Sequence, residues 1–302
     1  MSQPESPLGF AGLIGWDDDD LDEALAAYVS TVHSAETALP EPANGSARGF
    51  FESAFQPVLI SDAALYTGYY EPELPGSLLR TERFCFPLHS PPADLREGEV
   101  WHDRATIETG KLLAGREIVW VDDRLEAFLA QVQGSVRISL AEGGVLRLGF
   151  AAKNNHPYRS IGQELIRRGE GTDGRISVDQ IRQWARHNPE ALGDLLRHNP
   201  SYVFFRKLDL PAETGPLTTM QRPAVPLRTL AVDPAHVPLG SPVWVEAEGV
   251  GRLMVAQDTG GAIKGAGRGD IYVGSGPDAG RIAGSMQLRG RMVALFPKAE
   301  RG

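Results

Sequence analysis

The spacing of apolar side chains predicts two helices before residue 57. Residues 20–36 carry apolar side chains three and four positions apart, as on one face of a helix. The acidic run at 17–20 lies at the N-terminal end of this segment, where the helix dipole favours negative charge. A second helix is predicted to begin at Ser46, a residue type that caps helices, and to end before Pro57.

Three more helices are predicted in the middle of the chain. One begins at residues 122–123 and ends at 133–135, where glycine and serine interrupt the apolar spacing. Residues 177–180 have the spacing of a capping box at the start of another. Asn188 is expected to cap a third helix, with Pro189 as its first residue.

Short apolar runs between glycines and prolines predict β-strands over much of the remaining chain. One strand-like stretch ends in residues 65–72, and residues 143–144, both glycine, are expected to form a hairpin turn. The other predicted strands are 136–140, 145–150, 202–208, 227–232, 243–246, 253–256, 271–273 and 292–296. Prolines and turn residues accumulate from Pro72 to Pro92, which indicates that the chain leaves one domain there.

Composition and charge exclude several classes of protein. The chain has 302 residues, of which 42% are hydrophobic and 23% charged, as is ordinary for globular domains. Its net charge of −9 argues against sequence-independent nucleic-acid binding. Cys85 is the only cysteine, so an intramolecular disulfide and a cysteine-rich metal site are excluded. The seven histidines lack the spacing of a zinc site, and no run of apolar residues is long enough to cross a membrane.

The candidate chemistry lies in a glycine-rich stretch between two predicted strands. Asp258 and Asp270 stand twelve positions apart, each where a strand meets the loop. Cleavage of a glycosidic bond needs a carboxylic acid to protonate the leaving oxygen and usually a second group as base or nucleophile. Loop carboxylates that only cap turns are the alternative. Asp270 directly precedes an apolar strand, where partial burial would raise its pKa toward that of a general acid.

The glycines and the tyrosines near this stretch each allow two interpretations. The loop lacks a phosphate-binding motif, so its glycines, Gly260 and Gly261 among them, are better explained by the close approach of backbone to a bulky ligand. The tyrosines of residues 67–72 fit either a packed strand or a platform that stacks on sugar rings. Residues 153–159 are densely polar and fit a binding segment or a solvated loop.

Five motifs follow one another along the chain. They are Thr67-Gly-Tyr-Tyr-Glu-Pro72, Gln133-Gly-Ser135, Tyr158-Arg-Ser-Ile-Gly162, Asn199-Pro-Ser-Tyr-Val-Phe-Phe205, and Gln257-Asp-Thr-Gly-Gly-Ala-Ile-Lys-Gly265 with Gly269-Asp-Ile-Tyr272. Together they resemble the membrane-bound lytic murein transglycosylase A family. The match runs in order from about residue 60 to the C-terminus. The C-terminal part alone resembles the broader 3D domain, named for three aspartates that match Asp233, Asp258 and Asp270.

The resemblance implies a mainly β fold with α-helices, built as two β-rich domains that flank a groove. Residues 1–76 and 208–302 would form a double-psi β-barrel catalytic domain, including the N-terminal helices. Residues 77–207 would form an inserted, second β-barrel-like domain that contributes to the substrate groove. The family cleaves the β-1,4 bond between N-acetylmuramic acid and N-acetylglucosamine in peptidoglycan and leaves a 1,6-anhydromuramoyl end. No metal or organic cofactor is implied.

The resemblance also implies roles for individual residues. Asp270 matches the single catalytic acid and base. An intramolecular attack by the muramoyl C6 hydroxyl explains why one carboxyl suffices, because effective molarity replaces an activated water. Asp258 would support it, and Asp233 would be structural. The expected substrate-binding residues are Thr67, Tyr69, Gln133, Ser135, Tyr158, Gly260 and Gly261.

The expected partner is the glycan strand of peptidoglycan, with other cell-wall enzymes as further candidates and no nucleic acid. A monomer is expected, acting in the cell envelope, in the periplasm or associated with the outer membrane. The N-terminus departs from the family pattern, since this chain has no visible signal peptide or lipobox. Two other functions stay open: a β-glycan hydrolase that uses Asp258 and Asp270 as a pair, and a non-catalytic module that binds cell-wall glycan.

Overall fold

The computed structural model describes residues 8–33, 39–42, 45–171 and 174–298. The chain divides into two compact units. The first contains Met1–Tyr70, Glu213–Gly274 and Ser285–Gly302, and the second contains Glu71–Ala212 and Ser275–Gly284. The second unit therefore includes residues 275–284, which the predicted division assigns to the barrel domain.

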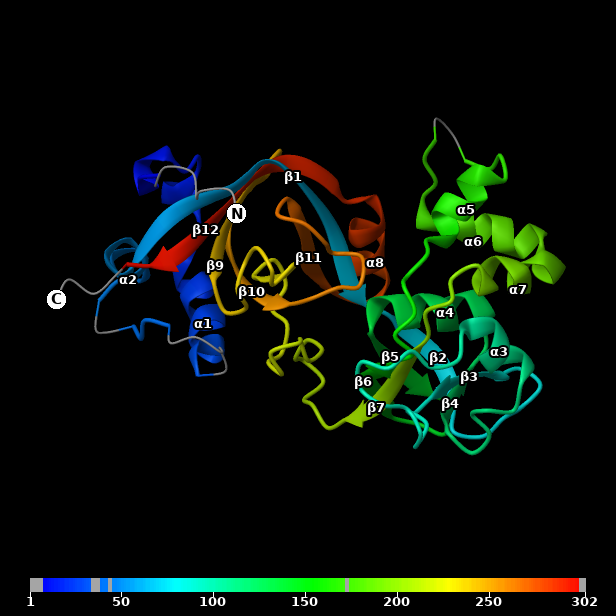
Figure 1. Cartoon of the computed structure of the whole chain (residues 1–302). Coiled ribbons are helices and arrows are strands. Elements are labelled where there is room, and N and C mark those ends of the chain that lie inside the picture. The colour runs from blue at the N-terminus through cyan, green and yellow to red at the C-terminus, as the bar shows by residue number, and fades with distance from the viewer. Residues whose placement is uncertain (1–7, 34–38, 43–44, 172–173, 299–302) are drawn as a thin grey trace. The chain divides into compact units, whose positions relative to one another are not determined.

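The first unit is built on a closed six-stranded barrel, as predicted (Figure 1). Around the barrel the strands follow the order β1-β11-β8-β10-β9-β12. They are β1 (Phe55–Glu71), β8 (Thr229–Val232), β9 (Pro242–Ala247), β10 (Val250–Asp258), β11 (Arg268–Ser275) and β12 (Gln287–Pro297). Strand β10 runs parallel to β8 and antiparallel to β9, so strands distant in sequence become neighbours in the wall.

Alternate residues of the barrel strands fill its interior. Tyr66, Leu230, Met254 and Ile271 are fully buried there in one apolar cluster. The phenol of Tyr66 donates a hydrogen bond of 2.8 Å to the carbonyl of Arg291, which satisfies its polar end. Because side chains alternate between the two faces of a strand, the residues next to these in sequence point outward.

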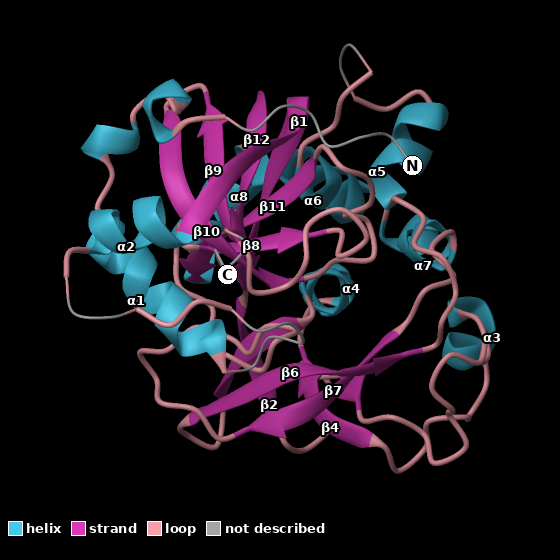
Figure 2. Cartoon of the chain, turned by 60° about the vertical axis from the view of Figure 1, so that its left-hand side comes forward, coloured by secondary structure: helices cyan, strands magenta, loops and turns pink. Residues whose placement is uncertain are grey.

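The N-terminal helices α1 (Leu21–Val32) and α2 (Ala47–Ala54) lie beside the outer face of the barrel (Figure 2). They follow two short 3-10 turns, Phe10–Gly12 and Trp16–Asp18. A second apolar cluster, which includes Tyr28, Phe51 and Trp244, joins them to the outward side chains of β9, β10 and β12. The predicted cap at Ser46 is present, and Asp20 caps α1 in the same way, since both side chains accept hydrogen bonds from first-turn amides of their helices.

The second unit contains a six-stranded sheet in the order β3-β4-β2-β5-β6-β7. Its strands are β2 (Glu73–Ser77), β3 (Phe86–His89), β4 (Glu117–Val121), β5 (Ser135–Leu140), β6 (Val145–Lys153) and β7 (Val203–Leu208). The sheet curves enough for its edge strands β3 and β7 to approach each other. Its helices are α3 (Arg104–Thr109), α4 (Arg124–Gln133), α5 (Ile161–Arg167), α6 (Val178–His187), α7 (Pro189–Arg197) and α8 (Gly276–Ser285).

Several predicted element boundaries are confirmed in the second unit. The capping box at the start of α6 is present, and both glycines at 143–144 adopt positive φ in the turn between β5 and β6. Asn188 is the N-cap residue of α7 and Pro189 its first residue, as predicted, but the Asn188 side chain donates to the carbonyl of Trp184 at the end of α6 and makes no capping hydrogen bond to α7. None of the helices in the described residues is long and apolar enough to cross a membrane.

A buried guanidinium fastens the N-terminal segment to the barrel. Arg228 is fully buried, and it bonds to both oxygens of Asp19, whose side chain is 2% exposed, and to Glu23. It also donates to the carbonyl of Leu253 in β10 at 2.9 Å. A buried pair of this kind is costly to break, because removal of one partner leaves the other charge buried without compensation.

The substitution Arg228→Met is expected to lower the free energy of unfolding by about 3–5 kcal/mol, because it leaves the Asp19 carboxylate buried without a positive partner. Urea denaturation followed by circular dichroism measures this. Arg289→Met is the matched control, since Arg289 is an exposed arginine on β12 and its loss should change stability by about 0.5 kcal/mol or less. Equal losses in the two variants would contradict the assigned role.

Candidate active site

The two candidate carboxylates stand on opposite sides of one short strand. Ala231 of β8 pairs with Asp270 of β11 on one side and with Asp258 of β10 on the other. Neighbouring strands lie about 4.8 Å apart, so the backbones of the two aspartates are separated by about 10 Å.

A register shift turns Asp258 to the same face of the wall as Asp270. Along β10, Ala256 pairs with Leu230 inside the barrel, and regular alternation would then place residue 257 opposite Ala231. The register instead slips by one residue, so Asp258 takes that place. A β-bulge acts in this way, re-aiming one side chain beside a functional site.

Asp270 accepts a single side-chain hydrogen bond from the described residues. The hydroxyl of Thr67 on β1 lies 2.5 Å from Oδ1 of Asp270. The same hydroxyl accepts from Nη2 of Arg268 at 3.3 Å. A guanidinium can only donate, so the proton of Thr67 is directed at Asp270.

Asp258 is bonded far more completely. Its Oδ1 accepts from the amide and the hydroxyl of Thr219, at 2.9 and 2.8 Å, and from the amide of Thr259 at 2.9 Å. Its Oδ2 accepts from the phenol of Tyr69 at 2.9 Å. Four donors stabilise the ionised form of a carboxylate.

The two environments favour different protonation states. Burial raises the pKa of Asp270 to about 6, while the Thr67 hydrogen bond and the charge of Arg268 lower it and the charge of Asp258 raises it. Burial also raises the pKa of Asp258, but four hydrogen bonds oppose that rise. Two nearby carboxyl groups in unequal surroundings can serve as a proton donor and an anion.

The glycine-rich loop between β10 and β11 is held in place by Asp233. Its carboxylate accepts from the amides of Gly265 at 2.8 Å and Ala235 at 3.2 Å, and these bonds lower the pKa of Asp233. At Gly260 a Cβ would lie 2.7 Å from Ile263, so the loop's own packing requires glycine there. At Gly261 a Cβ would meet nothing within 4 Å, so no neighbouring atom of the protein demands glycine at that position.

The tyrosine of the predicted platform has a hydrogen-bonding role in this site. The ring of Tyr69 packs against Tyr272 with centroids 5.3 Å apart, and its phenol is bonded to Asp258. Burial and the Asp258 charge raise the pKa of Tyr69 well above its usual value, so it remains a donor. Tyr69 therefore helps to hold Asp258 in its orientation.

Three of the predicted binding residues belong to the second unit. Gln133 ends α4 and Ser135 begins β5, with Gly134 between them at positive φ. Tyr158 is a surface residue whose hydroxyl is hydrogen-bonded to Ser160, the cap of α5. Thr67 and Tyr69, in contrast, lie with the aspartates in the first unit.

Three residues of the site were given no role from the sequence: Arg268 and Tyr272, which lie within or beside the predicted glycine-rich stretch, and Thr219. The first could have been found, because Arg268 precedes Asp270 by two positions in a strand and so shares its face. Thr219 lies in a connecting segment 39 positions before Asp258, and its spacing carries no signal. Among the described residues, no group of three or more histidine, cysteine or acidic side chains could hold a metal ion.

Comparison with known proteins gives two family matches. Residues 65–206 match the MltA-specific insert domain, and residues 228–296 match the 3D domain. The protein is therefore of the class in which an insert domain is combined with a 3D domain.

Individual relatives agree with these matches. The chain is 35% identical to membrane-bound lytic murein transglycosylase A of Escherichia coli K12 over 243 residues, which cover 76% of this chain and 65% of that protein. A lytic transglycosylase of Burkholderia pseudomallei, LtgG, is 39% identical with a TM-score of 0.63, and the match covers 99% of this chain and 97% of that one. A membrane-bound lytic murein transglycosylase of Agrobacterium tumefaciens is 29% identical with a TM-score of 0.86 over 97% of each chain. The chain belongs to the membrane-bound lytic murein transglycosylase A family.

The raised pKa of Asp270 predicts a pH-dependent effect of Asp270→Asn on stability. Between about pH 4, where an unfolded aspartate ionises, and about pH 6, the folded state retains a proton that the unfolded state loses. The carboxyl therefore weakens folding as pH rises through this window. We expect Asp270→Asn to raise the free energy of unfolding by about 1–3 kcal/mol at pH 8 and to leave it nearly unchanged at pH 4.

Denaturant titrations at the two pH values test this. Asp62→Asn is the matched control, since Asp62 is an exposed aspartate on β1 and its replacement should change stability little at either pH. A stabilisation by Asp270→Asn of the same size at pH 4 and pH 8 would show that ionisation of Asp270 is not its cause.

Proposed function

We propose that this protein is a peptidoglycan lytic transglycosylase, with Asp270 as its single acid and base. The enzyme would cleave the β-1,4 bond between N-acetylmuramic acid and N-acetylglucosamine and form a 1,6-anhydromuramoyl end. The observation that carries this proposal is the unequal bonding of the two carboxylates, one donor for Asp270 against four for Asp258. Family membership supports the choice of substrate.

In the first step, the protonated Asp270 donates its proton to the glycosidic oxygen. The bond between that oxygen and C1 of the muramoyl residue breaks, and positive charge develops at C1 and the ring oxygen. The ionised Asp258 would stabilise this charge, because preorganised groups act strongly in a site with little water. The hydrogen bond from the Thr67 hydroxyl to Asp270 would strengthen in this step, because that carboxyl becomes an anion.

In the second step, the Asp270 carboxylate takes the proton of the muramoyl C6 hydroxyl while the C6 oxygen bonds to C1. This closes the 1,6-anhydro ring and returns Asp270 to its protonated form. No water is consumed, and the proton count balances over the two steps. The nucleophile belongs to the substrate, so its effective concentration is high and a second catalytic carboxyl is unnecessary.

The residues proposed to bind the glycan are Thr67, Tyr69, Gly260 and Gly261 in the first unit, and Gln133, Ser135 and Tyr158 in the second. Gly261 supports this proposal: its surroundings have room for a Cβ, so a ligand that approaches the backbone explains its lack of a side chain. Escherichia coli MltA, 28% identical with a TM-score of 0.73, has been crystallised with bound chitohexaose. The relatives' designation as membrane-bound supports action in the cell envelope.

One other enzymatic function has an observation in its favour. Asp258 and Asp270 face the same side of the wall across one strand, as an acid and a base in a β-glycan hydrolase could do. Such an enzyme would activate a water molecule and leave a new reducing end. The products therefore distinguish the two reactions.

Digestion of purified peptidoglycan, followed by mass analysis of the fragments, is expected to give 1,6-anhydromuramoyl ends. Asp270→Asn should lower turnover by at least about 100-fold, because it removes the acid and base, and should retain glycan binding. Asp62→Asn should keep full activity. New reducing ends in place of anhydro ends would refute the transglycosylase, and unchanged turnover in Asp270→Asn would refute the role of that residue.

The pH profile gives a separate test of the Asp270–Thr67 pair. The value of kcat/KM should fall above about pH 6, as Asp270 loses its proton before substrate binds. In Thr67→Val the fall should move to higher pH, because the lost hydrogen bond favoured the ionised form. Thr67→Ser keeps the donor and should keep the wild-type profile. A shift to lower pH in Thr67→Val would contradict the assignment.

A further inference from the structure

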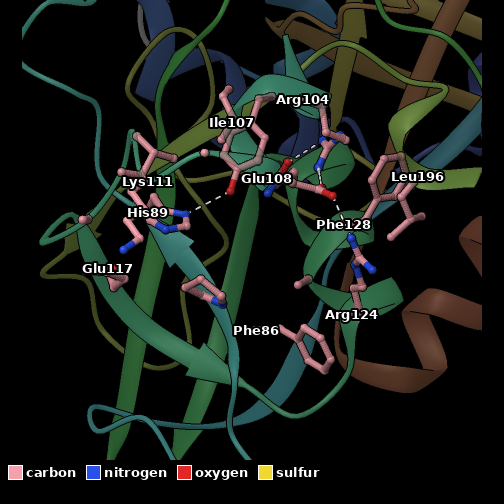
Figure 3. Close-up of a pocket in the computed structure, with 17 residues that line it drawn as sticks. Phe86, His89, Arg104, Ile107, Glu108, Lys111, Glu117, Arg124, Phe128 and Leu196 are labelled. Carbon is pink, nitrogen blue, oxygen red and sulfur yellow. Dashed lines mark hydrogen bonds and ion pairs between the residues drawn. The ribbon is translucent and has the colours of Figure 1, made fainter. Parts of the chain in front are cut away.

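The second unit contains a cavity of about 390 Å³ that shares no residue with the Asp270 site (Figure 3). Much of its lining is apolar. The apolar side chains include Phe86, Pro87, Ile107, Leu113, Phe128 and Leu196. A cavity of this size, with apolar walls and a few polar groups, has the usual character of a small-molecule site.

A chain of hydrogen bonds fixes the proton of His89 in this cavity. Arg104 donates to the amide oxygen of Gln131 at 2.6 Å, which leaves the amide nitrogen of Gln131 to donate to the phenol of Tyr202. The Tyr202 hydroxyl lies 2.9 Å from Nδ1 of His89 and has no other acceptor among the described residues, so we assign it as the donor to that nitrogen. The proton of the imidazole therefore lies on Nε2.

His89 consequently offers a neutral donor that the protein does not use. Its side chain is 8% exposed, and burial lowers its pKa to about 4, so it is uncharged near pH 7. None of the described residues accepts a hydrogen bond from Nε2. Because His89 lines the cavity, this donor is available to a ligand there.

Two charged groups lie on the same side of the cavity as His89 (Figure 3). Glu117 is the cross-strand neighbour of His89 between β3 and β4, and Lys111 lies in the segment that leads into β4. Neither charged group forms an ion pair or a side-chain hydrogen bond with the rest of the described chain. On the other side, the carboxylate of Glu108 is already bonded to Arg104 and Arg124.

We propose that this cavity binds the head group of an α-amino acid that carries an apolar side chain. The ammonium group would bind to Glu117, and the carboxylate would accept hydrogen bonds from Lys111 and from Nε2 of His89. The side chain would extend along the apolar wall toward Phe128 and Leu196. An α-amino acid carries an ammonium group and a carboxylate on the same carbon. Glu117 has the charge to bind the first, and Lys111 together with the neutral donor of His89 can bind the second.

Isothermal titration of the full chain with three six-carbon probes tests the proposal. Norleucine carries both charged groups, norleucinamide lacks the carboxylate, and hexanoate lacks the ammonium group. We expect norleucine to bind with a Kd in the millimolar range or below, and each of the other two to bind at least about tenfold more weakly. No binding of norleucine at millimolar concentration, or equal binding of norleucine and hexanoate, would overturn the proposal.

Single substitutions test which side chain binds the ammonium group and which binds the carboxylate. Glu117→Gln should weaken norleucine and leave hexanoate unchanged, and Lys111→Gln should weaken both. Lys207→Gln removes an exposed lysine of β7 outside the cavity lining and should weaken neither. Equal effects of Lys111→Gln and Lys207→Gln would overturn the assignment of Lys111.

The ¹⁵Nε2 resonance of His89 in the unmodified protein provides a readout that does not depend on the folding of a variant. It should shift as norleucine saturates the site, and an unchanged resonance at saturation would overturn the role of His89. A further probe is Nε-acetyl-lysine, which has the same α-amino acid head group on a longer side chain that ends in an amide. It distinguishes a head group that belongs to a peptide from a free amino acid. Binding comparable to that of norleucine supports a head group borne by a peptide, and binding of norleucine alone supports a free amino acid.

Discussion

The pairing of Ala231 with strands on both sides is the constraint on which the proposed site depends. The short strand β8 brings together residues twelve positions apart in sequence, and the register shift in β10 turns Asp258 to the face that Asp270 already occupies. Barrel closure adds β1 beside β11, which delivers Thr67 to Asp270. Without the shift, alternation would direct Asp258 into the apolar interior, where a charge is costly. The chemistry therefore follows from strand order and register.

Hydrogen bonding then makes the two carboxylates different. Asp258 is satisfied by two backbone amides and two hydroxyls, whereas the part of the chain that the structure describes offers Asp270 the hydroxyl of Thr67 alone. A carboxyl with few donors in a buried place retains its proton to higher pH, and one with many donors is stabilised as an anion. This difference is what a single-acid mechanism with a supporting anion requires.

The sequence was sufficient for most of the helices of the first unit and for the barrel strands, and it singled out Asp270 as the candidate acid, which stays a prediction. Capping residues and alternating apolar positions are local signals, and the two aspartates border a glycine-rich loop that is easily recognised. The orientation of Asp258 could not be predicted, because a slip of one residue in β10 leaves no trace in composition. Thr219 and the cavity group of His89, Lys111 and Glu117 were missed for a similar reason, since folding brings these separate segments together.

The most direct test of this account is a ¹³C NMR titration of the aspartate carboxyl groups, with Asp270 and Asp258 assigned by substitution. The account predicts that Asp270 titrates near pH 6 and that Asp258 becomes ionised at lower pH. If Asp258 instead held its proton to the higher pH, or if Asp270 titrated like an exposed aspartate, the assignment of Asp270 as the acid and base would be contradicted.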